Sequence, residues 1–441
     1  MKQKEKKIPY AIKFISSSLF LFMIGRWLWT DTYFSIYVKN IIGNAWWVTC
    51  IGALLAITKL FFSIPIGNIN ENGETKDILL LGKIFYALCG FLFFLAGLRE
   101  SVILLILAVI FNGMASSTTF TTYRNYYDQN TTNVNRSQIF WFYFSSINIA
   151  EIVGALISAI LVYYLDLPFM YFFVIIFSIL SLIQEQKIKD TIKKKFQFRK
   201  KKRRNKKNNL IKPVSQHEYF FWEKGFVKYF FKDCFSVKPR KKMLDIFKKY
   251  DKKLFISLWG ITLTNLLNYI GFLFIPIVSI ENNLNLSQIA LVFAVMKAPY
   301  LMNIIVGNLG DKYDKKLLIA MILITISTCY TLLWSLNGFS MTIILTFIIS
   351  LGIALLNPIC SALVSSNTKP KDKGKMAWLQ EAASKSWEII WALGFWCLSA
   401  LVGNKTGFII IGIIIFCLWC FLFAQKVQQI RTTNQEKTST I

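Results

Sequence analysis

The sequence predicts an all-α membrane protein with 12 transmembrane helices in two pseudo-symmetric six-helix halves. Apolar residues make up 55% of the 441 residues, whereas charged residues make up only 17%. Because a soluble domain typically carries about 25% charged residues, this composition argues against a soluble protein. Twelve mostly apolar runs recur along the chain, and each is long enough to cross about 30 Å of hydrocarbon. Basic residues gather in alternate turns between these runs, as they do in multi-pass membrane proteins.

The runs form two sets of six on either side of a long basic segment. We therefore expect a basic tail at 1–13, an amino-terminal half at 14–186, a basic linker at 187–253, a carboxy-terminal half at 254–425 and a second tail at 426–441. In chain order the runs lie near 14–38, 45–67, 78–98, 101–123, 138–164, 168–186, 254–279, 287–308, 317–335, 340–366, 377–402 and 406–425.

The distribution of basic residues predicts the orientation of the chain. Counted from a cytoplasmic amino terminus, the outer turns hold only Lys39, Arg99 and Lys405 as bases. Nearly all other lysines and arginines lie in the inner turns and the tails. Because cytoplasmic segments carry the excess of basic residues, both termini are predicted to be cytoplasmic in a multi-pass protein of the cell membrane.

The linker at 187–253 holds 25 of the 51 basic residues and six acids, a net charge of +19. Residues 193–207 contain eleven bases and no acid, so we expect this stretch to be drawn to anionic lipid headgroups. Nucleic-acid binding is the alternative, but attachment to a membrane already accounts for the charge. Residues 216–235 alternate aromatic and lysine stripes at helical spacing, which predicts a helix lying in the membrane interface.

One inner turn between two apolar runs has an unusual spacing of glycine, acid and bases. Its residues are Gly307, Asp311, Lys312, Lys315 and Lys316. The glycine permits close helix approach, and the aspartate can accept hydrogen bonds from the free N–H groups at a helix start. The spacing resembles the signature turn of the major facilitator superfamily, although Asp314 stands where that pattern has its second glycine.

The two halves resemble copies of each other. Gly67 and Glu71, after the second run, repeat the glycine and the acid of the turn at Gly307 in a degenerate form, at an offset of 240 residues. The fifth run contains Glu151 and the eleventh contains Glu388, and each glutamate lies 15 residues after a basic residue near the start of its run. Two parallel repeats of six helices are what the superfamily fold requires.

Ionisable residues inside the apolar runs need partners, because each costs about 2.5–3.5 kcal/mol at mid-bilayer on insertion scales. The resemblance implies that the second helix packs on the eleventh and the fifth on the eighth. That arrangement would pair Lys59 with Glu388 and Lys297 with Glu151 across the two halves. Alternatively, Lys385 pairs with Glu381 or Glu388 on its own helix, at i−4 or i+3, and the Lys59 side chain extends toward the membrane interface.

The resemblance also implies that the first, fourth, seventh and tenth helices line a central cavity. Each of them carries polar residues at helical spacing, although small polar residues also hold helices together. The predicted cavity residues are Arg26, Thr30, Asp31, Tyr33, Asn112, Ser116, Thr119, Asn265, Asn268, Tyr269, Asn357 and Ser361.

Together these features predict a secondary active transporter that moves a small organic solute across the membrane by alternating access. Proton coupling is one option, with Asp31 as the protonation site and Arg26 as its modulator or substrate anchor. A lipid or lysolipid flippase on the same fold is the alternative. No Ser, His and Asp constellation, metal-ligand spacing or phosphate-binding glycine loop is present in the sequence, so we expect neither an enzyme nor a cofactor. We expect a monomer that binds no nucleic acid.

Overall fold

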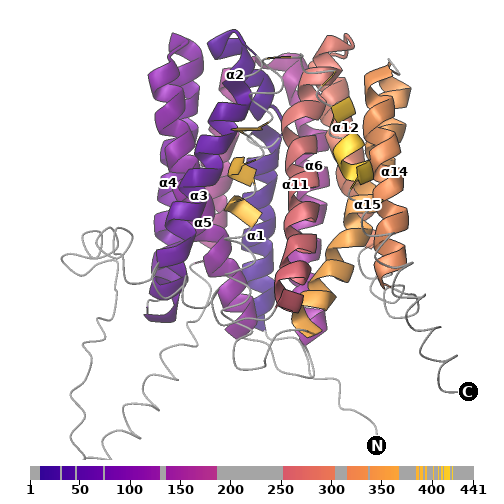
Figure 1. Cartoon of the computed structure of the whole chain (residues 1–441). Helices are drawn as coiled ribbons and strands as arrows, with labels where there is room; N and C mark the ends of the chain where they lie inside the picture. Colours follow the sequence, from indigo (N-terminus) through magenta and orange to yellow (C-terminus); the bar gives the residue numbers. More distant parts are fainter. Residues whose placement is uncertain are drawn as a thin grey trace, which may run out of the picture.

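The computed structural model describes most of both halves (Figure 1). The described ranges are 10–29, 32–44, 47–72, 75–129, 136–185, 252–302, 315–335 and 338–366, with short pieces between 384 and 420. Within these ranges the chain forms α-helices and two 3-10 helices, and it contains no strand. A helix satisfies its own backbone N–H and C=O groups, which hydrocarbon requires. The predicted fold class is confirmed.

The amino-terminal half consists of seven α-helices and one 3-10 turn in the described residues. They are α1 (Tyr10–Trp29), α2 (Phe34–Ile42), α3 (Trp47–Asn72), α4 (Thr75–Arg99), α5 (Val102–Gln129), α6 (Arg136–Tyr164), η1 (Leu167–Met170) and α7 (Tyr171–Glu185).

The first predicted span is divided into α1 and α2. The Thr32 hydroxyl donates a hydrogen bond of 2.6 Å to the carbonyl oxygen of Trp27, in the last turn of α1. Side-chain hydrogen bonds of this kind compete with helix continuation, so they give a local reason for the break. At its far end α2 stops at Gly43, whose φ of 83° is left-handed and whose N–H bonds to Lys39.

The carboxy-terminal half repeats this pattern of long apolar helices. Its described elements are α11 (Lys252–Glu281), α12 (Leu286–Lys297), η2 (Ala298–Met302), α14 (Lys315–Ser335) and α15 (Phe339–Ser366). A capping box starts α12: Asn285 accepts from the Gln288 N–H at 2.8 Å, and Gln288 accepts from the Asn285 N–H at 3.0 Å.

Within the described residues, six helices are long and apolar enough to cross a membrane, and three shorter apolar helices accompany them. The first ten predicted runs coincide with the described helices, to within a few residues at most ends. The eleventh and twelfth runs lie mostly outside the described residues. We call the end of the bundle where α1 begins the inner end, after the predicted orientation, and the opposite end the outer end.

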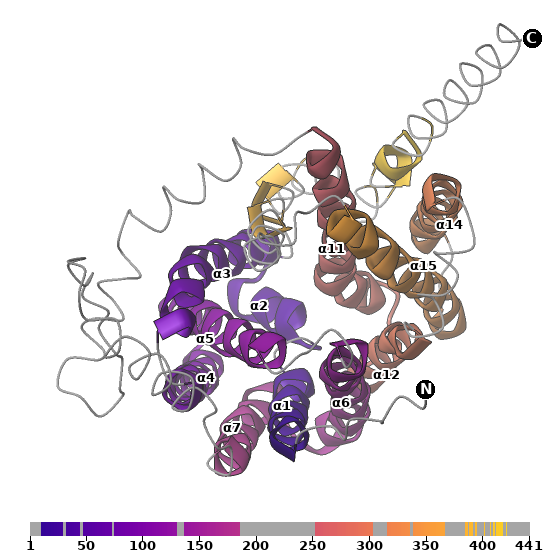
Figure 2. The same ribbon diagram turned by 90° about the horizontal axis from the view of Figure 1, so that it is seen from below.

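The two halves stand side by side, with their helices roughly parallel (Figures 1 and 2). Viewed along the helices, α1, α3, α4, α5 and α7 lie together in the amino-terminal half, whereas α11, α14 and α15 belong to the other half. The two halves meet where α6 packs against α12 and where α2 and α3 approach α11. This boundary is called the seam below.

The prediction that Gly67 and Glu71 lie in a turn is wrong, because both residues belong to α3, which continues to Asn72. A glycine inside a helix costs only about 1 kcal/mol, and α3 also continues past Pro65, two residues before Gly67. Similarly, Lys315 and Lys316 are the first two residues of α14 rather than part of a turn. Gly307, Asp311 and Lys312 lie outside the described residues, as do the stretches 193–207 and 216–235.

Candidate functional site

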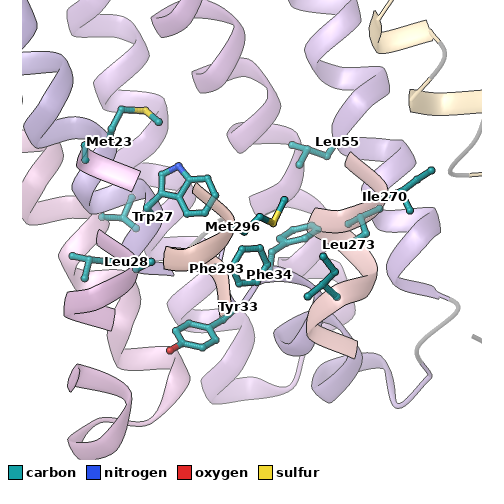
Figure 3. Packing of buried hydrophobic residues seen from close by; sticks show 14 of the residues in the cluster. Met23, Trp27, Leu28, Tyr33, Phe34, Leu55, Ile270, Leu273, Phe293 and Met296 are labelled. Carbon is teal, nitrogen blue, oxygen red and sulfur yellow. The ribbon is translucent and has the colours of Figure 1, made fainter. Parts of the chain in front are cut away.

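The outer part of the seam is closed by aromatic packing. The ring of Phe34 on α2 stacks on Phe272 of α11, with centroids 6.2 Å apart and ring planes 18° apart. Next to it, the fully buried Tyr33 lies between the halves, with its hydroxyl 3.3 Å from the carbonyl oxygens of Ser158 on α6 and Leu286 on α12. Figure 3 shows Tyr33 and Phe34 within a cluster of buried hydrophobic side chains. Tyr33, a predicted cavity residue, therefore belongs to the outer closure.

A glycine allows α3 and α11 to approach closely in the same region. A Cβ atom added at Gly52 would lie 2.7 Å from the Tyr269 hydroxyl and 3.0 Å from Leu273 Cδ1. The Tyr269 hydroxyl is buried and has no hydrogen-bond partner among the described residues. The predicted cavity residue Tyr269 is thus packed against the opposite half.

A buried ion pair crosses the seam between α6 and α12. Lys297 Nζ lies 3.4 Å from Glu151 Oε2, and the two side chains are 8% and 11% exposed. The ammonium also lies 4.6 Å from the ring centroid of Trp27 and 5.2 Å from that of Tyr300. Cations are attracted to aromatic faces at such distances, so the two rings add to the charge pair. The structure therefore brings together one of the two predicted inter-half pairs.

A hydrogen-bonded row continues from this ion pair into the carboxy-terminal half. Asn148 Nδ2 on α6 donates to the carbonyl oxygen of Tyr300 at 3.2 Å. The Tyr300 hydroxyl donates to Asn268 Oδ1 on α11 at 3.3 Å. Polar groups from both halves thus meet near the middle of the bundle, and the predicted residue Asn268 is among them.

For the second predicted pair, the structure shows the local alternative. Lys385 Nζ lies 2.6 Å from Glu388 Oε1, three residues along the chain. Lys59 is half-buried on α3, and its backbone oxygen accepts a hydrogen bond of 2.8 Å from Ser117. The i, i+3 spacing lets Lys385 reach Glu388 without crossing the seam.

The polar stripe on α5 is packed inside the amino-terminal half, contrary to the prediction that it lines an open cavity. Asn112, Ser116 and Thr119 are each 3% exposed or less. Ser116 bonds to the Tyr86 hydroxyl of α4 at 2.7 Å and to Asn112 at 3.3 Å. Small polar side chains make such contacts between membrane helices because hydrocarbon offers no other partner.

Arg26 is half-buried on α1, and its guanidinium carbon lies 4.8 Å from the ring centroid of Phe120. Asn265 and Asn357 are also half-buried on α11 and α15. Thr30 and Asp31 lie outside the described residues, and the side chain of Ser361 is not described.

Sequence reasoning missed a second buried ion pair, formed by Lys83 of α4 and Glu185 of α7. Their charged atoms lie 3.6 Å apart, and the side chains are 0% and 3% exposed. A lysine five residues inside the predicted run 78–98 was the available signal, because such residues need a partner in the membrane.

Comparison with known proteins decides the family. The family model described as Major Facilitator Superfamily matches residues 15–296 and 254–440 of the chain. The chain belongs to the Major Facilitator Superfamily. As a superfamily member with long apolar helices, it is a multi-pass membrane transporter. A search of curated protein sequences finds no match.

The superfamily assignment agrees with a solved structure of the same fold. The crystal structure of the human organic anion transporter MFSD10 (TETRAN) aligns with 94% of this chain and 100% of its own, with a TM-score of 0.61. The two sequences are 12% identical, so the likeness concerns the fold alone.

Proposed function

We propose that this superfamily member is a secondary active transporter that moves a small organic solute across the cell membrane by alternating access, with both termini in the cytoplasm. The observation that supports this most directly is the arrangement of the seam. Its outer part is apolar and tightly packed, around Phe34 and Phe272, whereas its middle holds the buried pair Lys297 and Glu151. Charges at this depth are costly and are typical of solute or ion pathways.

The apolar packing between α2 and α11 corresponds to an outward-closed state in this proposal. Opening the outer side would separate Phe34 from Phe272 and Tyr33 from Leu286, contacts that join different halves. None of these contacts involves a charge pair. The two halves can therefore separate at the outer end, and every charge keeps its counter-charge.

An anionic group is our first candidate for part of the solute. Arg26 presents a guanidinium beside the Phe120 ring, a combination suited to an anion with an aromatic body. The transporter of similar fold named above is an organic anion transporter by its title. Neither the family nor that structure favours the lipid or lysolipid flippase.

The test is a set of distances between spin labels on cysteines in reconstituted protein, after replacement of the native cysteines. One pair at Asn40 and Glu281 spans the outer ends of the halves, and a second at Lys13 and Met302 reports on the opposite side. A third pair, Asn40 and Asp166, lies within one half and serves as the control.

Alternating access predicts two populations whose proportions change with pH or with a solute found in a thermal-shift screen. In the second population the outer distance lengthens, the opposite distance shortens and the control distance stays constant. One fixed outer distance under every condition, or a control pair that changes equally, would overturn the proposal.

A further inference from the structure

The ion pair at the seam presents two opposite charges, one from each half, at the place where α6 meets α12. Lys297 Nζ and Glu151 Oε2 are 3.4 Å apart. The ring faces of Trp27 and Tyr300 lie beside the ammonium, with centroids at 4.6 Å and 5.2 Å. An ammonium, a carboxylate and two aromatic rings are therefore gathered at one point of the boundary between the halves.

This pair is less completely enclosed than the buried pair inside the amino-terminal half. The side chains of Lys297 and Glu151 are 8% and 11% exposed, whereas those of Lys83 and Glu185 are 0% and 3% exposed. Glu185 also accepts hydrogen bonds from one hydroxyl of α1 and one of α5, so its surroundings are completed within a single half. The seam pair is thus the one of the two whose charges a solute can reach when the halves move apart.

The surroundings of the seam pair add a hydrogen-bond donor and an apolar wall. The indole nitrogen of Trp27 is buried and has no hydrogen-bond partner among the described residues, although a buried indole N–H usually finds one. The same indole packs edge-on against Phe293 of α12, with centroids 6.2 Å apart. Met296, next to Lys297 in the chain, is buried in the same cluster (Figure 3). A solute at this point would meet both charges and an apolar surface.

The balance of charge decides which kind of solute fits. A solute with only a carboxylate could bind Lys297, but it would leave Glu151 without a counter-charge. A solute with only an ammonium would do the reverse. Leaving one member of a buried pair uncompensated is strongly unfavourable, because the protein interior cannot solvate it as water does. A solute that carries both charges replaces both partners at once, so every charge stays paired.

We propose that Lys297 and Glu151 form the binding site for a compact zwitterion with an apolar body, such as a hydrophobic α-amino acid. The solute carboxylate takes the place of Glu151 beside Lys297, and the solute ammonium takes the place of Lys297 beside Glu151. Without solute, the two side chains pair with each other across the seam, as the structure shows. This substrate class rests on the proposed transport function, but binding can be measured without transport.

The test is isothermal titration calorimetry of the full-length protein in lipid nanodiscs with two matched sets of probes. The first set is L-phenylalanine, hydrocinnamate and phenethylamine, which share one body and carry both charges, only the carboxylate or only the ammonium. The second set is L-leucine, isocaproate and isoamylamine. In at least one set the amino acid should bind wild-type protein at least about tenfold more tightly than either analogue.

Single variants should change the order of affinities within a set. Glu151→Gln removes the partner of the solute ammonium, so the carboxylate probe should then bind at least as tightly as the amino acid. Lys297→Met removes the partner of the solute carboxylate, so the amine probe should gain in the same way. Glu281→Gln, at the exposed outer end of α11, is the control and should keep the wild-type order. A pair that only held α6 on α12 would give equal losses for all three probes.

If a single variant does not fold, Lys297→Met/Glu151→Gln replaces it, because that double variant leaves no unpaired charge. In it the amino acid should lose its advantage over both analogues. The same loss of advantage in wild-type protein, or no binding of either amino acid, overturns the zwitterion site. So does an unchanged order of affinities in the Lys297 and Glu151 variants. If Arg26→Gln but not Lys297→Met removes the preference for the carboxylate, the anion binds at Arg26 and the site is refuted.

The site and the proposed transport function can fail separately. Zwitterion binding with the expected order, but with one fixed outer distance between the spin labels, would uphold the site and refute alternating access. Two populations of label distances, without any preference for a zwitterion, would uphold the transport proposal and refute the site.

Discussion

Removing one partner of the Lys83–Glu185 pair should destabilise the amino-terminal half far more than removing both. At the observed separation of 3.6 Å, the attraction between unit charges is about 4.6 kcal/mol for an effective dielectric constant of about 20. Lys83→Met or Glu185→Leu alone leaves a charge buried without its counter-charge, which costs about 3–5 kcal/mol. The hydroxyls of Ser18, Tyr123 and Ser181 can still bond to one another, at 2.8 Å between Ser18 and each of the other two.

The double variant Lys83→Met/Glu185→Leu should therefore unfold within about 2 kcal/mol of the wild type, or even be more stable. The measurement is reversible unfolding in mixed micelles, titrated with a denaturing detergent and followed by far-ultraviolet circular dichroism. Lys13→Met, at an exposed position of α1, is the control and should change stability by no more than about 0.5 kcal/mol. Single variants that cost less than about 1 kcal/mol, or a double variant that costs their sum, would refute the reasoning.

Three further predictions concern helix packing and the seam. Gly154→Ala should lower the stability by about 1–3 kcal/mol, because the added Cβ would lie 2.8 Å from Trp27 Cβ. Gly394→Ala is the control and should change the stability little, since its Cβ would meet open space among the described residues. Equal melting temperatures for the two variants would contradict this prediction. Phe34→Ala removes the stacked ring from the outer closure. An impermeant thiol reagent should therefore label a cysteine at Leu273→Cys faster in the Phe34→Ala background than in protein that keeps Phe34. An unchanged labelling rate would argue against the closure. Asn285→Ala removes the cap of α12 and should cost about 0.5–2 kcal/mol in the same unfolding titration, with no loss expected if the cap is unimportant.

The membrane spans were predictable because the bilayer imposes a length and an apolar composition on every helix that crosses it. The helices α3 to α6 begin and end within a few residues of the predicted runs, apart from the inner ends of α3 and α5. At the inner end of α3, Gly67 and Glu71 remained helical, because neither composition nor a single glycine determines where a helix stops. The break between α1 and α2 also escaped prediction, since it depends on one hydroxyl, that of Thr32, bonding to the preceding turn.

The charged site was predictable only in part. Lys297 and Glu151 were named from their depth and from the helix neighbours that the superfamily resemblance implies, and the structure places them 3.4 Å apart. Glu388 instead meets Lys385, a contact that local helix spacing already offered as the alternative. The polar stripe of α5 had the spacing of a cavity lining but faces α4, because periodicity shows which residues share a face and not what that face meets.

The sequence by itself determined that this protein is a helical membrane protein and indicated its transporter superfamily, since run length, charge placement and the superfamily turn are properties of the linear chain. Only the tertiary structure decided which buried charges meet. Lys83 and Glu185 are 102 residues apart and lie on helices that no local pattern pairs, yet their charged atoms are 3.6 Å apart. A buried charge must find its complement wherever packing brings one, and packing is settled by the contacts of all the helices together.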